Sequence, residues 1–166
     1  MDKAAKLLTT ALALWLAAAS CASSAGLYEE QMKLSRTTHA TGKTTSGKLA
    51  ALQAKAKADA LLGFRYEHGL GVAQSYEIAA DLYLRAAEQG DPTGQYYLGL
   101  MYDKGHGVWQ DGILAYKWLN LAAARAPARY REQYLRIRDA AASKLTQDQI
   151  YMGQELAIQW VPKPQW

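Results

Sequence analysis

The chain of 166 residues contains a single cysteine, Cys21, so an internal disulfide is excluded as a source of stability. Its three histidines, His39, His68 and His106, have no cysteine or carboxylate at the spacing of metal ligands, and we expect no metal site. Neither sign of charge dominates, because 19 lysines and arginines accompany 15 aspartates and glutamates. The resulting formal net charge of +4 is small and interspersed, which argues against a nucleic-acid partner.

Long apolar runs are also scarce, and the clearest one lies near the start of the chain. The run "LLTTALALWLAAA" (7–19) follows Lys3 and Lys6 and precedes the small residues of "SCASSAG". This three-part order is that of a secretory signal, and the run is too short to span a bilayer. We therefore expect residues 1–21 to be an export signal.

Cys21 stands where such a signal would be cut. The sequence A-A-S-C (18–21) resembles a bacterial lipobox, although Ala18 replaces the usual leucine, and this resemblance implies acylation of Cys21. Cleavage after Ala22 or Ala25 would instead give a soluble product. Ala22 is not the aspartate associated with retention at the inner membrane, so the resemblance implies an exported protein in the periplasm or, as a lipoprotein, at the outer membrane.

The segment "TGKTTSGKLA" (41–50) is one residue short of the phosphate-binding pattern G-x-x-x-x-G-K-[ST], because Leu49 occupies the position of the magnesium-binding hydroxyl. A phosphate loop also needs a strand before it, and the preceding "MKLSRTTHA" is polar without strand alternation. We interpret residues 22–47 as a flexible linker whose end caps a helix that starts near Lys48.

What the sequence does have is an internal repeat with a period of 36 residues. "LLGFRYEHGLGVAQSYEIAADLYLRAA" (61–87) aligns with "YLGLMYDKGHGVWQDGILAYKWLNLAA" (97–123). We expect the complete repeats to cover about 54–89 and 90–125. Among the positions that recur unchanged are Leu62, Gly63, Tyr66, Gly69 and Gly71 in the first copy and Leu98, Gly99, Tyr102, Gly105 and Gly107 in the second.

Each copy predicts a helix, a tight turn and a second helix. In the second copy Leu98 and Tyr102 share one helix face, and Gly99 would admit a close neighbour. Gly105 would end this helix in a left-handed conformation, and Asp111 would cap the next one, as Ser75 would in the first copy. The second helices would bury a stripe made of Ile78, Ala79, Leu82, Tyr83 and Ala86 in the first copy and of Leu114, Ala115, Trp118, Leu119 and Ala122 in the second.

The pattern LGxxYxxGxGVxQ, followed by AA and by EQGD (88–91), closely resembles the Sel1-like repeat, a relative of the tetratricopeptide repeat. This resemblance implies an all-α fold, an α/α solenoid of two helix-turn-helix repeats over residues 48–124. The first copy departs from the family at its start, where "AKAKADA" replaces the usual G-D-A-x-A-Q. Its first helix could therefore run back to Lys48, or a separate helix from about Lys48 to Ala58 could add a layer.

Residues 126–161 predict a C-terminal helical hairpin that caps the solenoid, because the last apolar face of a solenoid must be covered. Thr146 and Gln149 have the spacing of a capping box at the start of its second helix. Residues 162–166 would form a tail. The first helix of the hairpin (128–145) has one apolar face, consisting of Tyr130, Tyr134, Ile137 and Ala141.

The family resemblance implies a non-catalytic scaffold or adaptor for protein–protein interaction, which binds a peptide or a partner helix on the concave face lined by the first helix of each repeat. Apolar anchors and both charge signs at these positions suit such a partner. Phe64 and Leu100 could alternatively pack on the N-terminal helix, whereas Tyr96 would be a surface anchor that folding does not need. The positions transferred from the family are Lys57, Ala60, Phe64, Glu67, His68, Thr93, Tyr96, Leu100, Asp103 and Lys104.

The alternative to a binding scaffold is an enzyme, which is a different class of function. A cysteine-rich branch of the same family is associated with β-lactam binding or hydrolysis, but this chain lacks the paired cysteines and the S-x-x-K motif of such sites. No triad, dyad or metal set can be assembled, so we expect no catalysis, no cofactor and no small-molecule substrate.

A basic patch extends from Arg125 to Arg138. It would form a solvated helix face, partly paired with Glu132 and Asp139. Binding to a lipid surface is the alternative, because a lipid-anchored protein lies beside anionic headgroups.

We expect the mature protein to begin at Cys21 with an acyl group attached, and the mass of the N-terminal peptide of protein purified from its own envelope tests this. A Cys21→Ser variant should lose the added mass. An N-terminal peptide that starts at Ser23 or Gly26 without added mass would support the soluble alternative. Retention of residues 1–20 would contradict the export signal itself.

Overall fold

The computed structural model describes residues 45–163. The proposed export signal, Cys21, His39 and nearly all of the proposed linker lie outside the described residues. The chain divides into two compact units after Lys48, so the packing below is that of residues 49–163. All regular secondary structure in the described part is helical, in six helices, which confirms the all-α fold class.

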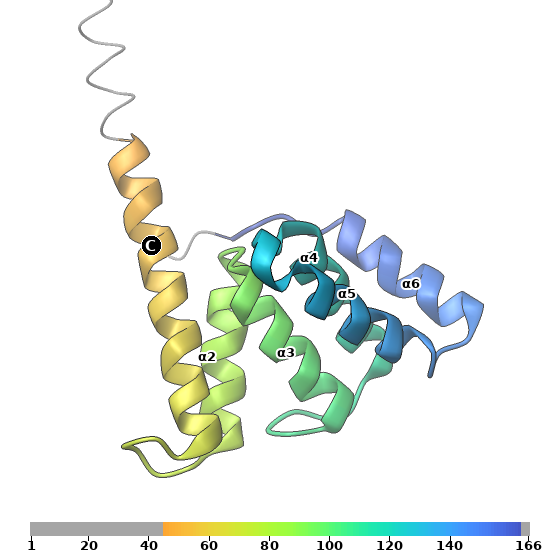
Figure 1. Cartoon of the computed structure of the whole chain (residues 1–166), viewed down its shortest axis with the longest axis horizontal. Helices are drawn as coiled ribbons and strands as arrows, with labels where there is room; N and C mark the ends of the chain where they lie inside the picture. The colour runs from red at the N-terminus through yellow and green to blue at the C-terminus, as the bar shows by residue number, and fades with distance from the viewer. Residues whose placement is uncertain (1–44, 164–166) are drawn as a thin grey trace, which may run out of the picture. The chain divides into compact units, whose positions relative to one another are not determined.

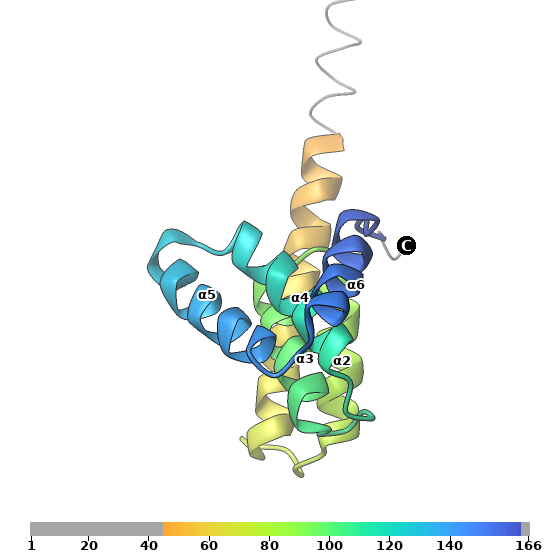
Figure 2. The ribbon, with the colours of Figure 1, turned by 90° about the vertical axis from the view of Figure 1, so that its right-hand side faces the viewer.

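The helices form three consecutive hairpins (Figures 1 and 2). A first helix over 45–68 pairs with α2 (Tyr76–Glu88). The second hairpin consists of α3 (Pro92–Lys104) and α4 (Gly112–Arg125), and the third consists of α5 (Ala128–Ala142) and α6 (Gln147–Ile158). The third hairpin packs on the second through α4, which contacts both α5 and α6.

The first helix is continuous over 45–68, which answers the question of its start. A separate helix from Lys48 to Ala58 is therefore wrong, and residues 45–47 are helical rather than part of the expected linker. The sequence between Gly47 and Gly63 is rich in alanine, leucine and lysine and contains no helix breaker, so nothing interrupts the backbone hydrogen bonds.

The predicted caps form. Ser75 Oγ accepts a hydrogen bond from the Ile78 N–H at 3.2 Å, and Asp111 Oδ1 accepts from the Ile113 and Leu114 N–H groups at 2.9 Å. Gly105 ends α3 with φ of 70°, a left-handed conformation that costs glycine little. The caps fix where each helix starts and ends, and thereby which face each helix presents.

The two helices of each repeat approach closely at an equivalent glycine. A Cβ atom on Gly99 would lie 2.7 Å from Leu119 Cγ and 3.1 Å from the Ala115 carbonyl oxygen. In the first repeat, a Cβ atom on Gly63 would lie 2.9 Å from the Tyr83 ring. Atoms do not approach this closely without strain, so glycine is required at both positions.

The buried residues form two clusters on either side of the α3/α4 pair. The first cluster joins α2, α3, α4 and α6, and the second joins α3, α4 and α5. Eight of the ten residues in the predicted stripes are buried and Leu114 is half-buried, but Ile78 is 46% exposed, so its predicted burial is wrong. Ile78 lies in the first turn of α2, next to the exposed turn over 69–74, where no helix covers it.

The predicted capping hairpin forms as α5 and α6. Thr146 and Gln149 make both hydrogen bonds of the capping box. After α6 the chain turns back, and the Trp160 ring packs edge-on against Trp118 with centroids 6.0 Å apart. The Lys163 N–H then donates to the Glu88 carbonyl oxygen at 2.7 Å, so the start of the tail is attached to the end of α2.

We expect Gly99→Ala to lower the free energy of unfolding by about 1–3 kcal/mol, because the added methyl group overlaps Leu119. Gly47→Ala is the matched control, since nothing lies within 4 Å of a Cβ atom there. That control should leave stability unchanged or raise it by up to about 1 kcal/mol. Urea unfolding of both variants measures the difference, and equal stability of Gly99→Ala and wild type would contradict the close contact.

Candidate partner-binding groove

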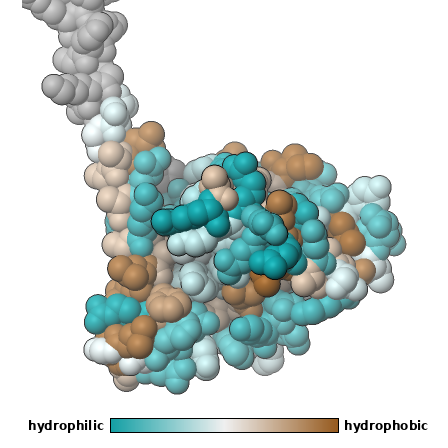
Figure 3. Space-filling view, viewed as in Figure 1, coloured by the Kyte–Doolittle hydropathy of each residue, from teal (hydrophilic) through white to brown (hydrophobic). Residues whose placement is uncertain are grey.

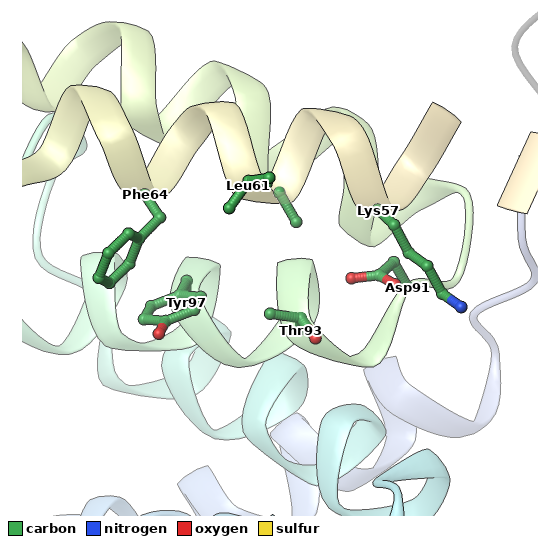
Figure 4. Close-up of a pocket in the computed structure, with 7 residues that line it drawn as sticks. Lys57, Leu61, Phe64, Asp91, Thr93 and Tyr97 are labelled. Atoms are coloured by element: carbon green, nitrogen blue, oxygen red, sulfur yellow. The ribbon is translucent and has the colours of Figure 1, made fainter. Parts of the chain in front are cut away.

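A groove lies between the first helix and α3 (Figure 4). Its volume is about 260 Å³, and its lining is mostly apolar with a few polar groups. In Figure 3, which shows a different view, apolar surface also gathers along the first helix. The residues that line the groove are Lys57, Ala60, Leu61, Phe64, Asp91, Thr93 and Tyr97.

Helical periodicity explains this lining. The four lining residues of the first helix follow the i, i+3, i+4, i+7 spacing that places side chains on one face. Thr93 and Tyr97 are four residues apart and share the facing side of α3. Phe64 and Tyr97 meet across the groove with ring centroids 5.7 Å apart, as Figure 4 shows. The groove therefore has an aromatic end, whereas Lys57 and Asp91 lie at its polar end.

A chain of ring contacts, here called the aromatic row, extends from the groove towards α5. Tyr97 contacts Tyr96, and Tyr96 stacks on Tyr134 with centroids 4.2 Å apart. Tyr134 stacks in turn on Tyr130, at 6.2 Å. Exposure differs along the row, because Tyr96 and Tyr134 in its middle are buried whereas Tyr130 at its end is 38% exposed. The aromatic row consists of Phe64, Tyr97, Tyr96, Tyr134 and Tyr130.

Some polar groups that line the groove already form interactions within the fold. Asp91 caps α3, since its Oδ2 accepts from the Gly94 N–H at 2.8 Å. Burial raises the pKa of this carboxyl group, although the cap hydrogen bonds and the nearby Lys57 act in the opposite direction. Burial also raises the pKa of Tyr97, and that of Tyr134 to about 12, so both phenols stay protonated near neutral pH.

The structure brings four of the ten family-derived positions together in the groove: Lys57, Ala60, Phe64 and Thr93. The others lie elsewhere. Glu67 accepts a hydrogen bond from the Tyr83 hydroxyl at 2.8 Å, and Asp103 forms an ion pair with Lys144 at 2.8 Å. The His68 ring lies 4.1 Å from that of Phe64, and Lys104 is exposed near the end of α3.

Two expectations about these positions are corrected. Tyr96 is only 7% exposed and stacks on Tyr134, so it is a core residue and not a surface anchor. Leu100 packs against the same cluster as Tyr96, on the α5 side rather than on the N-terminal helix. Phe64 is half-buried and both lines the groove and packs on the core, which combines the two alternatives.

Sequence reasoning missed three lining residues, Leu61, Asp91 and Tyr97. Leu61 follows Lys57 by one helical turn, and Tyr97 follows Thr93 in the same way, so the periodicity of positions already chosen could have found both. Asp91 is the N-cap of α3, and its place in the groove depends on how the two helices pack.

Among residues 45–163, none of the helices combines the length and apolar character that a membrane span requires. The same part of the chain has no group of three or more histidine, cysteine, aspartate or glutamate side chains that could hold a metal ion.

Paired helices stacked beside an open groove define a helical repeat protein. Residues 56–91 and 92–126 each match the family model of the Sel1 repeat, so this region of the chain is similar to two consecutive Sel1 repeats. No curated protein matches the chain.

Two solved structures are similar to this one. The crystal structure of a protective antigen present in uropathogenic Escherichia coli strains, which displays an SLR fold, has 30% sequence identity and a TM-score of 0.59. The match covers 69% of this chain and 24% of that one, so this chain spans about a quarter of that protein. A Sel1 repeat protein from Oxalobacter formigenes has 40% identity over 48% of this chain and 33% of its own, with a TM-score of 0.44.

We expect Tyr96→Ala to lower the free energy of unfolding by about 3 kcal/mol or more, because it removes a buried ring from the second cluster. Leu61→Ala should change it by less than about 0.5 kcal/mol, because Leu61 is 65% exposed. Urea denaturation followed by far-UV circular dichroism measures both. Similar losses for the two variants would contradict the burial described here.

Proposed function

We propose that this chain is a non-catalytic scaffold that binds an extended segment of another protein in the groove between the first helix and α3. This proposal rests on one observation, an apolar side chain that is exposed to solvent within the groove. Leu61 is 65% exposed although it lies between Ala60 and Phe64 on the lining face. A partner segment that covers it would gain the free energy of burying this surface.

The dimensions of the groove favour an extended segment. From Lys57 to Phe64 the first helix advances by about 10 Å, at roughly 1.5 Å per residue. This length holds about three residues of an extended chain, at roughly 3.3 Å per residue. We expect a segment of this size to bind with weak to moderate affinity, because it buries little surface against the entropy cost of association.

The walls of the groove are rigid, which also supports a binding role. The first helix is held on α2 at Gly63, and α3 is held on α4 at Gly99. The backbones of packed helices are already in place, so binding costs less of the entropy of assembling the site. We further propose that the scaffold acts in the cell envelope, because residues 1–21 resemble an export signal.

The proposal is tested by selecting binders from a displayed random-peptide library and mapping the best one by amide chemical shifts. We expect the shifts to cluster at 57–64 and 91–97. Leu61→Asp should weaken the selected peptide by about 10-fold or more, because it places a charge on the apolar wall. Leu70→Asp is the matched control, since Leu70 is 50% exposed in a turn outside the groove.

The control variant should keep its affinity within about 2-fold, as expected for a remote surface change. Shifts centred elsewhere, or equal loss of affinity in Leu61→Asp and Leu70→Asp, would count against binding in this groove.

A further inference from the structure

The carboxylates on the groove-side helices are largely occupied by partners within the fold. On the first helix, Asp59 lies 3.7 Å from Arg85, and Glu67 accepts from the Tyr83 hydroxyl at 2.8 Å. Both interactions point towards α2. These two acidic groups are therefore not presented to a ligand in the groove.

The same holds for α3, whose two acidic groups are its cap and Asp103. Asp91 is 7% exposed and its Oδ2 is used by the Gly94 N–H. Asp103 is paired with Lys144 at 2.8 Å. The acidic groups on and next to both helices that form the groove therefore already interact with partners within the fold.

On α5, Asp139 pairs with Arg138 at 2.7 Å. Glu132 is two residues from Tyr130 and two from Tyr134, and side chains at that spacing do not face each other on a helix. Glu132 therefore lies away from the aromatic row that joins α5 to the groove.

In the described part of the chain, two cations are not paired with a carboxylate in this way: one lines the groove and the other lies at the far end of the aromatic row. Lys57 lines the groove, is exposed, and is close enough to Asp91 to act on its pKa without forming an ion pair within 4.0 Å. At the other end of the aromatic row, the Arg129 guanidinium lies 4.5 Å from the centroid of the Tyr130 ring. A cation held over an aromatic face keeps its outer donors available.

We propose that the groove selects an acidic segment, in which an apolar side chain covers Leu61 and Phe64 and a neighbouring carboxylate pairs with Lys57. This inference rests on the function proposed above and adds the chemical class of the partner. Charge complementarity supports this inference. The apolar walls of the groove are accompanied by the unpaired Lys57 ammonium, whereas the nearby carboxylates already have partners within the fold.

Two other occupants fit less well. A basic segment would meet the Lys57 ammonium and would find Asp91 almost fully buried. A second copy of this chain carries a formal net charge of +4, so self-association would bring like charges together. Both become outcomes of the experiment.

The test uses three short fluorescein-labelled peptides with the same leucine and tyrosine positions, in which the remaining positions are all glutamate, all glutamine or all lysine. Fluorescence anisotropy at low salt gives their affinities for the protein. We expect the glutamate peptide to bind about 10-fold more tightly than the lysine peptide, and added salt to reduce that preference.

Two charge-reversal variants make the test specific to the groove. Lys57→Glu should weaken the glutamate peptide by about 5-fold to 10-fold and should spare the glutamine peptide. Lys55→Glu carries the same charge change on the same helix, but Lys55 does not line the groove and lies about 160° around the helix from Lys57. Its effect should stay within about 2-fold.

The possible failures are distinguishable. If Leu61→Asp weakens all three peptides and they bind wild type equally, the acidic class is wrong and the groove function stands. A preference for the lysine peptide, or equal effects of Lys55→Glu and Lys57→Glu, overturns the inference as well. If Leu61→Asp leaves the affinity of all three peptides unchanged, both the acidic class and the groove function are wrong. Concentration-dependent self-association in sedimentation would then identify a second copy of the chain as the occupant.

Discussion

The close contact between the two helices of each repeat, made at one glycine per repeat, is the constraint on which the structure depends. Gly63 lies against Tyr83, and Gly99 lies against Leu119, at equivalent points of the two repeats. These contacts fix each first helix on its partner, and Gly94 of α3 also lies against Ala86 of α2. The first helix and α3 are therefore both packed on α2, and the groove lies between them.

The aromatic row connects the groove to the core. Tyr96 and Tyr134 are buried and hold α5 on α3, whereas Phe64 and Tyr97 are half-buried and form the groove wall. The rings that stabilise the fold are therefore adjacent to the rings that form the proposed binding surface. This arrangement explains why a substitution at Tyr96 would confuse a loss of folding with a loss of binding, and why Leu61, which is exposed, is the better probe of recognition.

Much of the fold could be predicted from the sequence, because its signals are local. The 36-residue period, the caps at Ser75 and Asp111 and the capping box at Thr146 involve residues close in the chain. The errors have a different origin. The exposure of Ile78 and the burial of Tyr96 depend on which neighbouring element covers each position, and the repeat pattern does not contain that information.

The candidate site shows the same division. The sequence by itself determined the helical repeats and their boundaries to within a few residues, and its resemblance to the Sel1-like repeat supplied the groove positions Lys57, Ala60, Phe64 and Thr93. Only the tertiary structure decided that Leu61, Asp91 and Tyr97 complete the groove and that Asp59, Glu67 and Asp103 do not contribute charge to it. The physical reason is that helix geometry follows from neighbours along the chain, whereas exposure and ion pairing follow from which helices come into contact.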